Sequence, residues 1–481
     1  MNASLATLIY ACGIAGLFYL DRDSSVRTSK ALWLPVIYLW VDASRPISLW
    51  LGTPPPPGAN VQLDGSPVDR AFYLVLLIAA LVVLIQRGSR ALKFVNANWP
   101  ILAYFFFCLV SVIWSDYPDV AFKRWTKAIG DIAMILVVVT DEQPVAALRR
   151  LFSRLGFILL PASLLLIKYY PALGRYYGVW DGAQINTGVT LDKNLLGVIT
   201  FVLSLGAAWR VLGLLRSAKD LPDRRRHLIA QGTLLAFGIY LLSLANSATS
   251  IVSFSLGAGL LLATSLQYVR RHAAAVHVLV LSLIIIASSV MLLGGGADVT
   301  QALGRQSNLT GRTDIWADVI PMAPNPLVGA GFESFWLNPN VHQKLAALIP
   351  GLPLNEAHDG YIEMYLELGW VGLILIGLVL IDGYRRSVNA FRRDPALGGL
   401  FIAYIVAAVV YNVTEAGFRM MHPMWVFLLL AVVEASVIAA GVTSTAPKRQ
   451  AAPADLSLQV PASDAPAASS QQAYSSLKVA R

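Results

Sequence analysis

The chain has 481 residues, of which 56% are hydrophobic and 14% are charged, and its formal net charge is +9. Soluble proteins carry about 25% charged residues, so this composition excludes an ordinary cytoplasmic enzyme, and it is too apolar for a disordered chain. A basic balance can indicate nucleic-acid binding, but the cytoplasmic loops of membrane proteins also collect Lys and Arg, so we predict no nucleic-acid partner. We expect an all-α polytopic membrane protein.

Thirteen apolar segments predict about 12–13 transmembrane helices, because roughly 20 apolar residues cross a membrane. No basic segment precedes the first of them, so no cleavable signal is predicted. The segments fall near 3–20, 31–51, 71–86, 99–114, 127–140, 152–169, 194–214, 228–246, 251–268, 276–294, 359–381, 398–414 and 421–441.

The basic residues predict how these segments are oriented. If the connection at 21–30 faces the cytoplasm, alternate connections and the C-terminal tail carry 25 of the 37 Lys and Arg residues. Cytoplasmic loops are enriched in these residues. The connections at 169–193 and 295–358 are therefore expected on the periplasmic side, and the C-terminus is expected in the cytoplasm.

Four regions follow from this pattern. We expect an N-terminal helix bundle over 1–294, a large periplasmic loop over 295–358 and C-terminal membrane helices over 359–441. Residues 442–481 are rich in Ala, Ser, Pro and Gln, which predicts a disordered cytoplasmic tail. The loop contains aromatic residues such as Trp316 and Trp336, so we expect it to fold on the helices.

The long loop contains a candidate anion site at Arg312. Gly311-Arg312-Thr313-Asp314 resembles the start of a short helix, where free amide groups and a guanidinium can bind an anion together. The alternative is that Arg312 pairs with Asp314 or Glu333 and only holds the loop. The glycines of Pro326-Leu327-Val328-Gly329-Ala330-Gly331 predict a structural turn.

The end of the same loop contains a candidate acid–base group. His358 lies between Glu356 and Asp359, at the predicted mouth of the segment 359–381. A histidine with an ordinary pKa near 6.5 suits proton transfer at neutral pH, so it is a candidate general base. A lone histidine is more often structural.

Further charged residues lie in other predicted periplasmic connections. Lys193 begins a membrane helix, where a cation opposes the helix dipole, and it follows Arg175 in the same connection. Binding of an anionic head group explains this placement, with snorkelling of Lys193 as the alternative. Glu415 and Arg419 flank the last outer turn, where a functional role and a helix-pinning ion pair are both open.

These motifs, in this order, resemble the O-antigen ligase and polysaccharide polymerase superfamily over about residues 30–440. Leu32-Trp33-Leu34-Pro35 with Ser44-Arg45-Pro46 resembles more narrowly the branch of exopolysaccharide production proteins related to the succinoglycan polymerase. The pattern departs from many members at His358-Asp359, where they have His-Asn, and at Lys193, where some ligases have Arg. The motifs that carry the resemblance are Gly311-Arg312 with Trp316, Pro326-Leu327-x-Gly329-x-Gly331, His358-Asp359-Gly360-Tyr361, Glu367-x-Gly369-x-x-Gly372 and Asp192-Lys193-Asn194-x-x-Gly197.

The resemblance implies a bacterial inner-membrane glycosyltransferase that acts on the periplasmic side without metal or cofactor. Its donor would be an oligosaccharide on undecaprenyl diphosphate, and its acceptor a second lipid-linked glycan or lipid A-core. Membrane lipids and other polysaccharide export proteins would be further partners. The expected catalytic residues are His358, Asp359 and Glu356, the expected diphosphate ligands are Arg312, Lys193 and Arg175, and the expected supporting residues are Asp314, Glu333, Glu415 and Arg419.

We expect inverting transfer and favour a polymerase over a ligase because of the Ser-Arg-Pro segment. A lipid or glycan transporter is an alternative of another class. It calls for paired charges deep in several helices and for related halves, and no internal repeat is evident. A noncatalytic assembly scaffold is a third interpretation, in which loss of His358 would leave activity intact.

Overall fold

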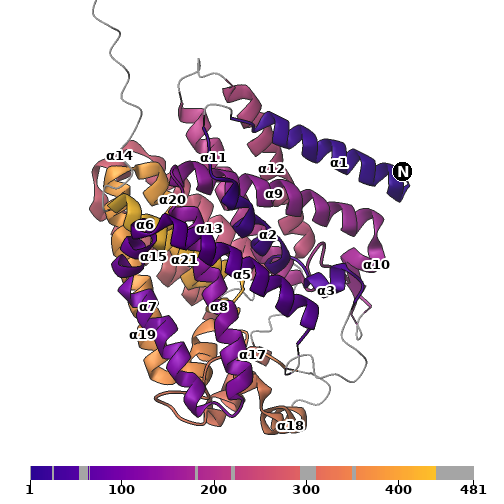
Figure 1. Ribbon diagram of the computed structural model, residues 1–481, viewed down its shortest axis with the longest axis vertical. Helices are drawn as coiled ribbons and strands as arrows, with labels where there is room; N and C mark the ends of the chain where they lie inside the picture. Colours follow the sequence, from indigo (N-terminus) through magenta and orange to yellow (C-terminus); the bar gives the residue numbers. More distant parts are fainter. Residues whose placement is uncertain are drawn as a thin grey trace, which may run out of the picture. The chain divides into compact units, whose positions relative to one another are not determined.

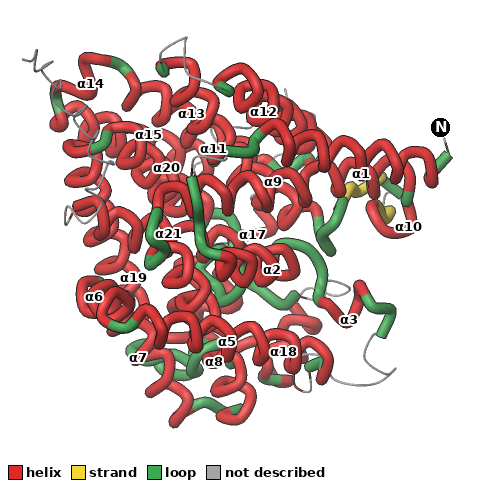
Figure 2. Tube along the Cα trace, turned by 45° about the horizontal axis from the view of Figure 1, so that its top comes forward, coloured by secondary structure: helices red, strands yellow, loops and turns green. Residues whose placement is uncertain are grey.

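The computed structural model describes residues 2–23, 26–53, 63, 65–178, 182–217, 223–292, 310–348 and 354–439. The predicted cytoplasmic tail lies outside these residues, as do residues 293–309 and 349–353 of the predicted loop region. Within the described part the chain is almost entirely helical, which confirms the expected all-α class (Figure 2).

The helices of the first third of the chain are α1 (Ala3–Leu20), α2 (Trp33–Asp42), α3 (Ile47–Trp50), α5 (Pro67–Arg87), α6 (Ser89–Ala97), α7 (Trp99–Val110), α8 (Pro118–Val139) and α9 (Pro144–Tyr169). The middle third contains α10 (Pro171–Gly174), α11 (Lys193–Arg216), α12 (Arg224–Ala245), α13 (Ala248–Ser265), α14 (Gln267–Arg271) and α15 (Ala273–Leu292). The last third contains α17 (Thr310–Val319), α18 (Pro339–Leu348), α19 (Gly360–Arg393), α20 (Pro395–Tyr411) and α21 (Pro423–Ala439).

Short 3₁₀ turns and one hairpin complete the described elements. The turns are Lys30–Leu32, Ser111–Trp114, Ile320–Met322 and Phe335–Leu337. The hairpin pairs β1 (Arg175–Tyr177) with β2 (Gln184–Asn186) in antiparallel register, and Arg175 lies opposite Asn186.

Seven described helices are long and apolar enough to cross a membrane: α1, α5, α9, α11, α12, α13 and α19. The consecutive helices α6 and α7 form a pair bent by 84°, which brings the number to eight if they make one span, and α15, α20 and α21 are apolar but shorter. A multi-pass membrane protein is therefore confirmed. The number of full spans differs from the 12–13 segments expected, because several apolar segments form short or broken helices, as 31–51 does in α2 and α3.

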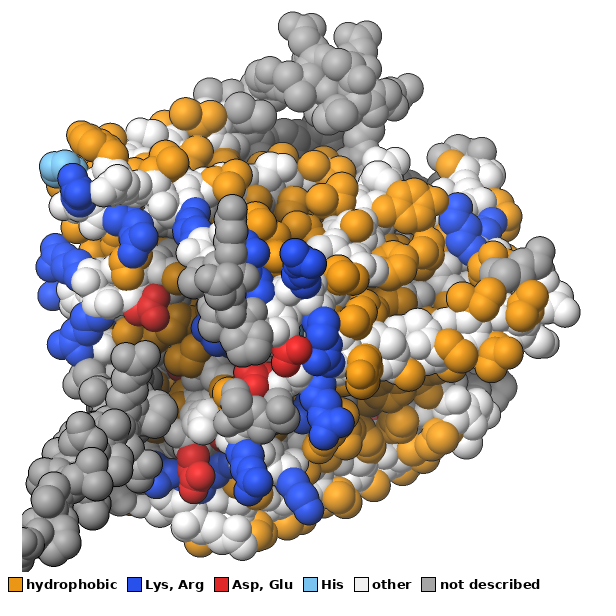
Figure 3. Space-filling view, turned by 90° about the horizontal axis from the view of Figure 1, so that it is seen from above, with side chains coloured by type: hydrophobic (Ala, Val, Ile, Leu, Met, Phe, Trp, Pro, Cys, Tyr) orange, Lys and Arg blue, Asp and Glu red, His pale blue; other side chains and the backbone are white. Residues whose placement is uncertain are grey.

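Basic side chains are visible at one end of the bundle. The connection that contains α14 lies at one end, and the loop helix α18 lies at the other (Figure 1). Viewed from the α14 end, Lys and Arg side chains gather on one side of that face (Figure 3). Which connections face the cytoplasm and which face the periplasm stays a prediction.

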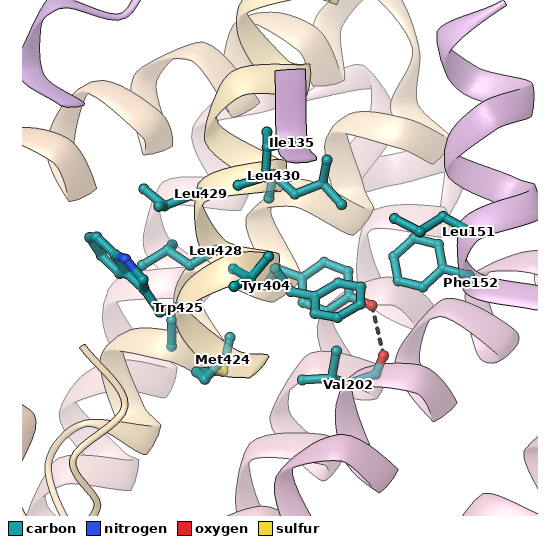
Figure 4. Close-up of a cluster of buried hydrophobic side chains, with 14 of the residues drawn as sticks. Ile135, Leu151, Phe152, Val202, Tyr404, Met424, Trp425, Leu428, Leu429 and Leu430 are labelled. Carbon is teal, nitrogen blue, oxygen red and sulfur yellow. Dashed lines mark hydrogen bonds between the residues drawn. The ribbon is translucent and has the colours of Figure 1, made fainter. Parts of the chain in front are cut away.

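The centre of the bundle is built by the short helices α20 and α21, whose side chains are nearly all buried. Phe152 of α9 stacks on Tyr404 with ring centroids 5.9 Å apart, and the Tyr404 hydroxyl donates to the carbonyl of Val202 at 2.7 Å (Figure 4). This hydrogen bond gives the buried Tyr404 hydroxyl the partner that it needs away from water. The last two apolar segments are thus the core around which the longer helices pack.

The long loop has an apolar core of its own. Side chains of α17, α18 and the turn at Phe335–Leu337 pack together with residues near the start of α19. The members include Ile315, Val319, Phe335, Trp336, Val341, Leu345, Ala357 and Leu366. The described part of the loop is therefore folded onto the membrane helices, at the mouth of α19.

Candidate functional site

The start of α19 fixes the backbone of the candidate acid–base residues. The side chain of Asp359 caps the helix by accepting from the amides of Tyr361 and Ile362, each at 2.8 Å. An N-cap acceptor of this kind satisfies amide groups that have no partner within the helix. His358, just before the cap, has a φ of 53°, an uncommon conformation for a residue other than glycine.

Hydrogen bonds to both backbone groups hold the preceding residue, Ala357, one from the loop and one from α19. Its carbonyl accepts from the indole of Trp316 at 2.8 Å, and its amide donates to Glu363. Glu363 also accepts from the indole of Trp336 at 2.7 Å. The uncommon backbone at His358 is thus set by tryptophans of the loop and a carboxylate of α19, as expected where the surroundings over-determine a strained residue.

Glu356, His358 and Glu415 form the acidic and imidazole part of the site. Nδ1 of His358 lies 2.9 Å from Oε1 of Glu356 and 3.7 Å from Oε2 of Glu415. The 2.9 Å contact is an ion pair when the imidazole is protonated. Both carboxylates therefore face the same imidazole nitrogen.

Two arginines contact the outer oxygens of these carboxylates. Arg312 of α17 donates to Oε1 of Glu415 at 3.0 Å and to the carbonyl of Thr414. Arg419 donates to Oε2 of Glu356 at 2.9 Å. Arg312 thus pairs with Glu415 and not with Glu333. Arg419 pairs with Glu356 and not with Glu415. The predicted alternative of an Arg312–Asp314 pair involves a side chain outside the described residues.

The start of α11 reaches the same cluster. Nδ2 of the Asn194 side chain donates to Oε2 of Glu415 at 3.3 Å, and the Asp192 side chain caps the helix by accepting from the backbone amide of Leu195 at 2.8 Å. Arg45 donates to the carbonyls of Val189 at 3.2 Å and Thr190 at 3.1 Å. The Ser-Arg-Pro segment thereby supports the stretch before α11, and Asn194 contacts the cluster from the start of that helix.

Asn412, which is fully buried, ties the two ends of the site together. Its carbonyl accepts from the amide of Gly360 at 2.8 Å, and its side-chain oxygen accepts from the amide of Gly417 at 2.8 Å. A Cβ at Gly360 would lie 1.9 Å from that oxygen, so only glycine fits. The helix start that contains Asp359 is thus fastened to the turn that contains Glu415 and Arg419.

The loop also repairs a break in α19. Gly369 has a φ of 63°, and the kink leaves amides of the helix without their usual partners. The amide of Trp370 donates to the carbonyl of Pro326 at 2.9 Å, and the amide of Gly331 donates to the carbonyl of Glu367 at 2.8 Å. The predicted structural turn at 326–331 is therefore observed, and it lies against the kink.

The charges around His358 shift the protonation of the cluster. Burial alone lowers the pKa of His358, but Glu356 and Glu415 outweigh it and raise the pKa to about 9. Burial alone raises the pKa of Glu356, but His358 and Arg419 lower it to about 2. Burial raises the pKa of Asp359 to about 6, against the opposing effect of its two amide donors. The ordinary histidine pKa assumed from the sequence does not hold in this environment.

Glu356, His358 and Glu415 also have the composition of a metal site, with ligand atoms all within 4.8 Å of one another. Each carboxylate, however, is already paired with an arginine, through Arg419 and Arg312. Those guanidinium groups repel a bound cation and compensate the same charges. The arrangement therefore suits an anionic ligand better than a metal ion.

Five of the predicted site residues thus meet in one cluster, and two lie apart from it. Glu333 contacts Arg124 at 3.9 Å, in the wall between the loop and α8. Arg175 lies in β1, where it donates to the carbonyl of Ile167 and to Gln184 at 3.2 Å. The residues of the cluster are Arg312, Glu356, His358, Glu415 and Arg419, with Asp359 at its edge as a cap.

Several residues of the site were not singled out by sequence reasoning. Asn194 was noted only as part of a longer motif. Glu363, Trp336 and Asn412 hold the segments next to the cluster through tertiary hydrogen bonds. Asn412 carried one usable signal, because it is a polar residue inside the apolar segment 398–414. Polar residues at membrane depth generally have a structural partner or a function.

Two comparisons with known proteins support the predicted resemblance. Residues 233–377, which include Arg312, Glu356 and His358, match the family model described as O-antigen ligase. The chain is also 27% identical over 316 residues to the "Exopolysaccharide production protein ExoQ" of Rhizobium meliloti (strain 1021). That alignment covers 63% of this chain and 68% of the relative. The resemblance to the O-antigen ligase and polysaccharide polymerase superfamily is thereby confirmed.

Proposed function

We propose that this protein is a bacterial inner-membrane glycosyltransferase that polymerises exopolysaccharide repeat units on the periplasmic side. Its donor is a glycan on undecaprenyl diphosphate, and its acceptor is a second lipid-linked glycan. The observation that carries the proposal is the cluster in which Glu356, His358 and Glu415 lie between Arg312 and Arg419. The two similarities support a polymerase or ligase type of activity.

The proposed reaction is a single displacement at the anomeric carbon. A hydroxyl oxygen of the acceptor forms a bond to that carbon, while the bond from the carbon to the diphosphate oxygen breaks. The electron pair leaves with the lipid diphosphate, and the hydroxyl proton passes to Nε2 of His358. Attack from the face opposite to the leaving group inverts the configuration.

The cluster can stabilise both charges that form in this reaction, the positive charge on the imidazole and the negative charge on the leaving diphosphate. Nδ1 of His358 faces Glu356, which leaves Nε2 for the substrate and stabilises the imidazolium that forms. Arg312 and Lys193 stabilise the leaving diphosphate by charge-assisted hydrogen bonds. Arg175 lies in β1, where its hydrogen bonds are with Ile167 and Gln184 and not with the cluster, so we assign this role to Arg312 and Lys193.

The raised pKa of His358 makes the base role testable. With a pKa of about 9, only a small neutral fraction acts as a base at neutral pH, so the rate rises about tenfold per pH unit and levels off near pH 9. The same pKa favours a second role, in which the imidazolium donates a proton to the leaving diphosphate. In that case the rate is flat and falls above pH 9, so the pH–rate profile separates the two roles.

The function is tested by complementation of a deletion strain with wild type, His358→Gln and Arg312→Gln, with protein amounts matched by immunoblot. We expect both variants to lose long secreted chains and to accumulate single repeat units on lipid. His277→Gln is the matched control, because His277 contacts Tyr384 rather than the cluster. Wild-type chain lengths from His358→Gln at equal protein amount would contradict the proposal and favour a scaffold.

The description of the matching family model favours a second candidate function, transfer of a finished glycan to lipid A-core. The same strains distinguish it. A ligase defect leaves long chains on their lipid carrier and removes them from lipid A-core, whereas a polymerase defect leaves only single repeat units.

A further inference from the structure

A cavity of about 470 Å³ opens next to the candidate site, between α5, the first turns of α8 and the turn after α20. The helices α5 and α8 lie side by side along it (Figures 1 and 2). Its charged lining consists of five basic residues and one acidic residue, which are Arg70, Lys123, Arg124, Lys127, Arg419 and Glu333. The cavity therefore carries a strong positive excess.

The floor of the cavity is ordered by aromatic residues. The hydroxyl of Tyr38 donates to Asp131 at 2.8 Å, and the ammonium of Lys127 lies 5.9 Å from the ring centroid of Tyr73. A Cβ at Gly130 would lie 3.1 Å from the Tyr38 hydroxyl, so glycine lets this ring lie close to α8. The cations are thus presented on a fixed surface.

One side of the cavity is apolar and continues into an exposed apolar face of α5. Leu74 and Leu77 of α5 line it, and Leu74 belongs to a row of exposed apolar side chains on that helix, with Ile78 and Leu81. An anionic head among the cations would therefore have its hydrocarbon chain running along α5. This combination fits a phosphorylated lipid better than a soluble anion.

Arg419 connects the cavity to the catalytic cluster. It lines the cavity and also donates to Glu356, whose other oxygen contacts His358. Arg312 and Asn194 contact Glu415 instead, through other elements. The cluster thus has Arg312 on its Glu415 side, whereas Arg419 on its Glu356 side belongs to the group of cations that line the cavity.

We propose that this cavity binds the phosphorylated head of a second glycan lipid, the acceptor, while the donor diphosphate binds at Arg312 and Lys193. The inference rests on the proposed function, because an enzyme that joins two lipid-linked glycans must hold two like-charged heads at once. Two such heads repel each other, so separate cationic sites lower the cost of bringing them together. Lys123 and Lys127, one helical turn apart on α8, are the main ligands, and Arg70 completes the site from α5.

The test counts bound lipid on the full-length protein in phosphatidylcholine nanodiscs titrated with undecaprenyl diphosphate. Wild type is expected to bind two molecules, and Lys123→Gln/Lys127→Gln to bind one tightly and the other about tenfold or more weakly. Arg312→Gln should weaken binding of the molecule at the donor site and leave binding in the cavity unchanged. Lys168→Gln is the matched control, because Lys168, like Lys127, lies against a tyrosine ring, that of Tyr240. This variant should still bind two lipid molecules.

The outcomes separate this inference from the proposed function. One equivalent on wild type, lost in Arg312→Gln and unchanged in the lysine variant, would overturn the second site and leave the proposed function standing. No binding to wild type would overturn both. Loss of both equivalents from the folded lysine variant, with its monodisperse gel-filtration profile intact, would also overturn two separate sites.

Two competitors identify the source of the phosphate. Inorganic diphosphate is expected to displace the second equivalent only at concentrations far above those of the lipid, because it lacks the chain that contacts α5. Phosphatidylglycerol in the nanodisc is expected to leave the count unchanged. Displacement by phosphatidylglycerol at its membrane concentration would overturn the assignment to a glycan lipid and identify a general site for anionic phospholipid.

Discussion

Arg419 donates a hydrogen bond to Glu356 at 2.9 Å, and this pair joins the turn between α20 and α21 to the segment that precedes α19. Glu356 contacts His358 through its other oxygen. Arg419 therefore affects both the position of Glu356 and the electrostatic environment of His358. The carboxylate that orients the imidazole is itself oriented by a cation. Changes at Glu356 should therefore be measurable at His358.

Glu356→Gln should lower the pKa of His358 from about 9, because it removes a negative charge that favours the imidazolium. The midpoint of the pH–rate profile of the purified enzyme should move to lower pH by about one unit or more. Asp382→Asn is the control, since Asp382 pairs with Arg386 further along α19. An unchanged midpoint in Glu356→Gln would remove His358 from the titration that limits the rate.

Stability should depend on pH through the same two residues. The pKa of His358 is raised from 6.5 to about 9 on folding, so its contribution is complete below pH 6.5 and is lost as the pH rises through about 9. The pKa of Glu356 is lowered from 4.5 to about 2, so its contribution is present above pH 4.5 and is lost as the pH falls towards about 2. Thermal unfolding in detergent should show the highest Tm between these limits.

His358→Gln is the variant that tests this pH dependence. The fall in Tm from pH 6.5 to about pH 9 should be smaller than in wild type, because the titrating group is gone. An identical fall in both proteins would assign the loss of stability at alkaline pH to other groups.

Gly369→Ala should destabilise the protein by at least about 1–3 kcal/mol, because it places a side chain at positive φ. The new Cβ would also lie 2.3 Å from the backbone of Leu327. Gly377→Ala in the same helix meets nothing within 4 Å and should be neutral or slightly stabilising. Equal Tm values for the two variants would show that the loop does not pack against the kink.

Removal of divalent metal should leave the transfer rate unchanged, because Arg312 and Arg419 already compensate the carboxylates that form the candidate metal site. The measurement is the rate of chain extension by purified enzyme with and without EDTA. Added Zn²⁺ should inhibit by competing with the arginines for Glu356 and Glu415. Loss of activity in EDTA that Mg²⁺ or Zn²⁺ restores would assign a metal to this site.

The membrane class and most helix positions could be predicted from apolar run length, because burial in lipid demands that pattern. The number of full spans could not, since a run such as 31–51 does not reveal that Pro46 separates α2 from α3. Length alone also gave no sign that the short helices α20 and α21 form the centre. Their burial depends on which helices pack around them, which is a tertiary property.

The residue types of the site could be predicted, but their partners could not. His358 and Arg312 stood out by type and position, whereas the pairings of Arg312 with Glu415 and of Arg419 with Glu356 join distant segments. Asp131 was not singled out, although it accepts from the amide of Met421, next to the turn that contains Arg419. Such contacts are set by the fold, so single-sequence patterns contain no record of them.

The hydrogen bonds between the passage 326–331 and the kink of α19 have a consequence for engineering. The loop supplies hydrogen-bond partners to the backbone of a membrane helix. The passage 326–331 and the kink region 366–371 should therefore be exchanged together. A chimaera that imports a relative's loop to change glycan specificity should carry 326–331 and 366–371 from the same parent. If the two segments came from different proteins, peptide groups of α19 would lose their hydrogen-bond partners. Unpaired peptide groups destabilise a membrane helix.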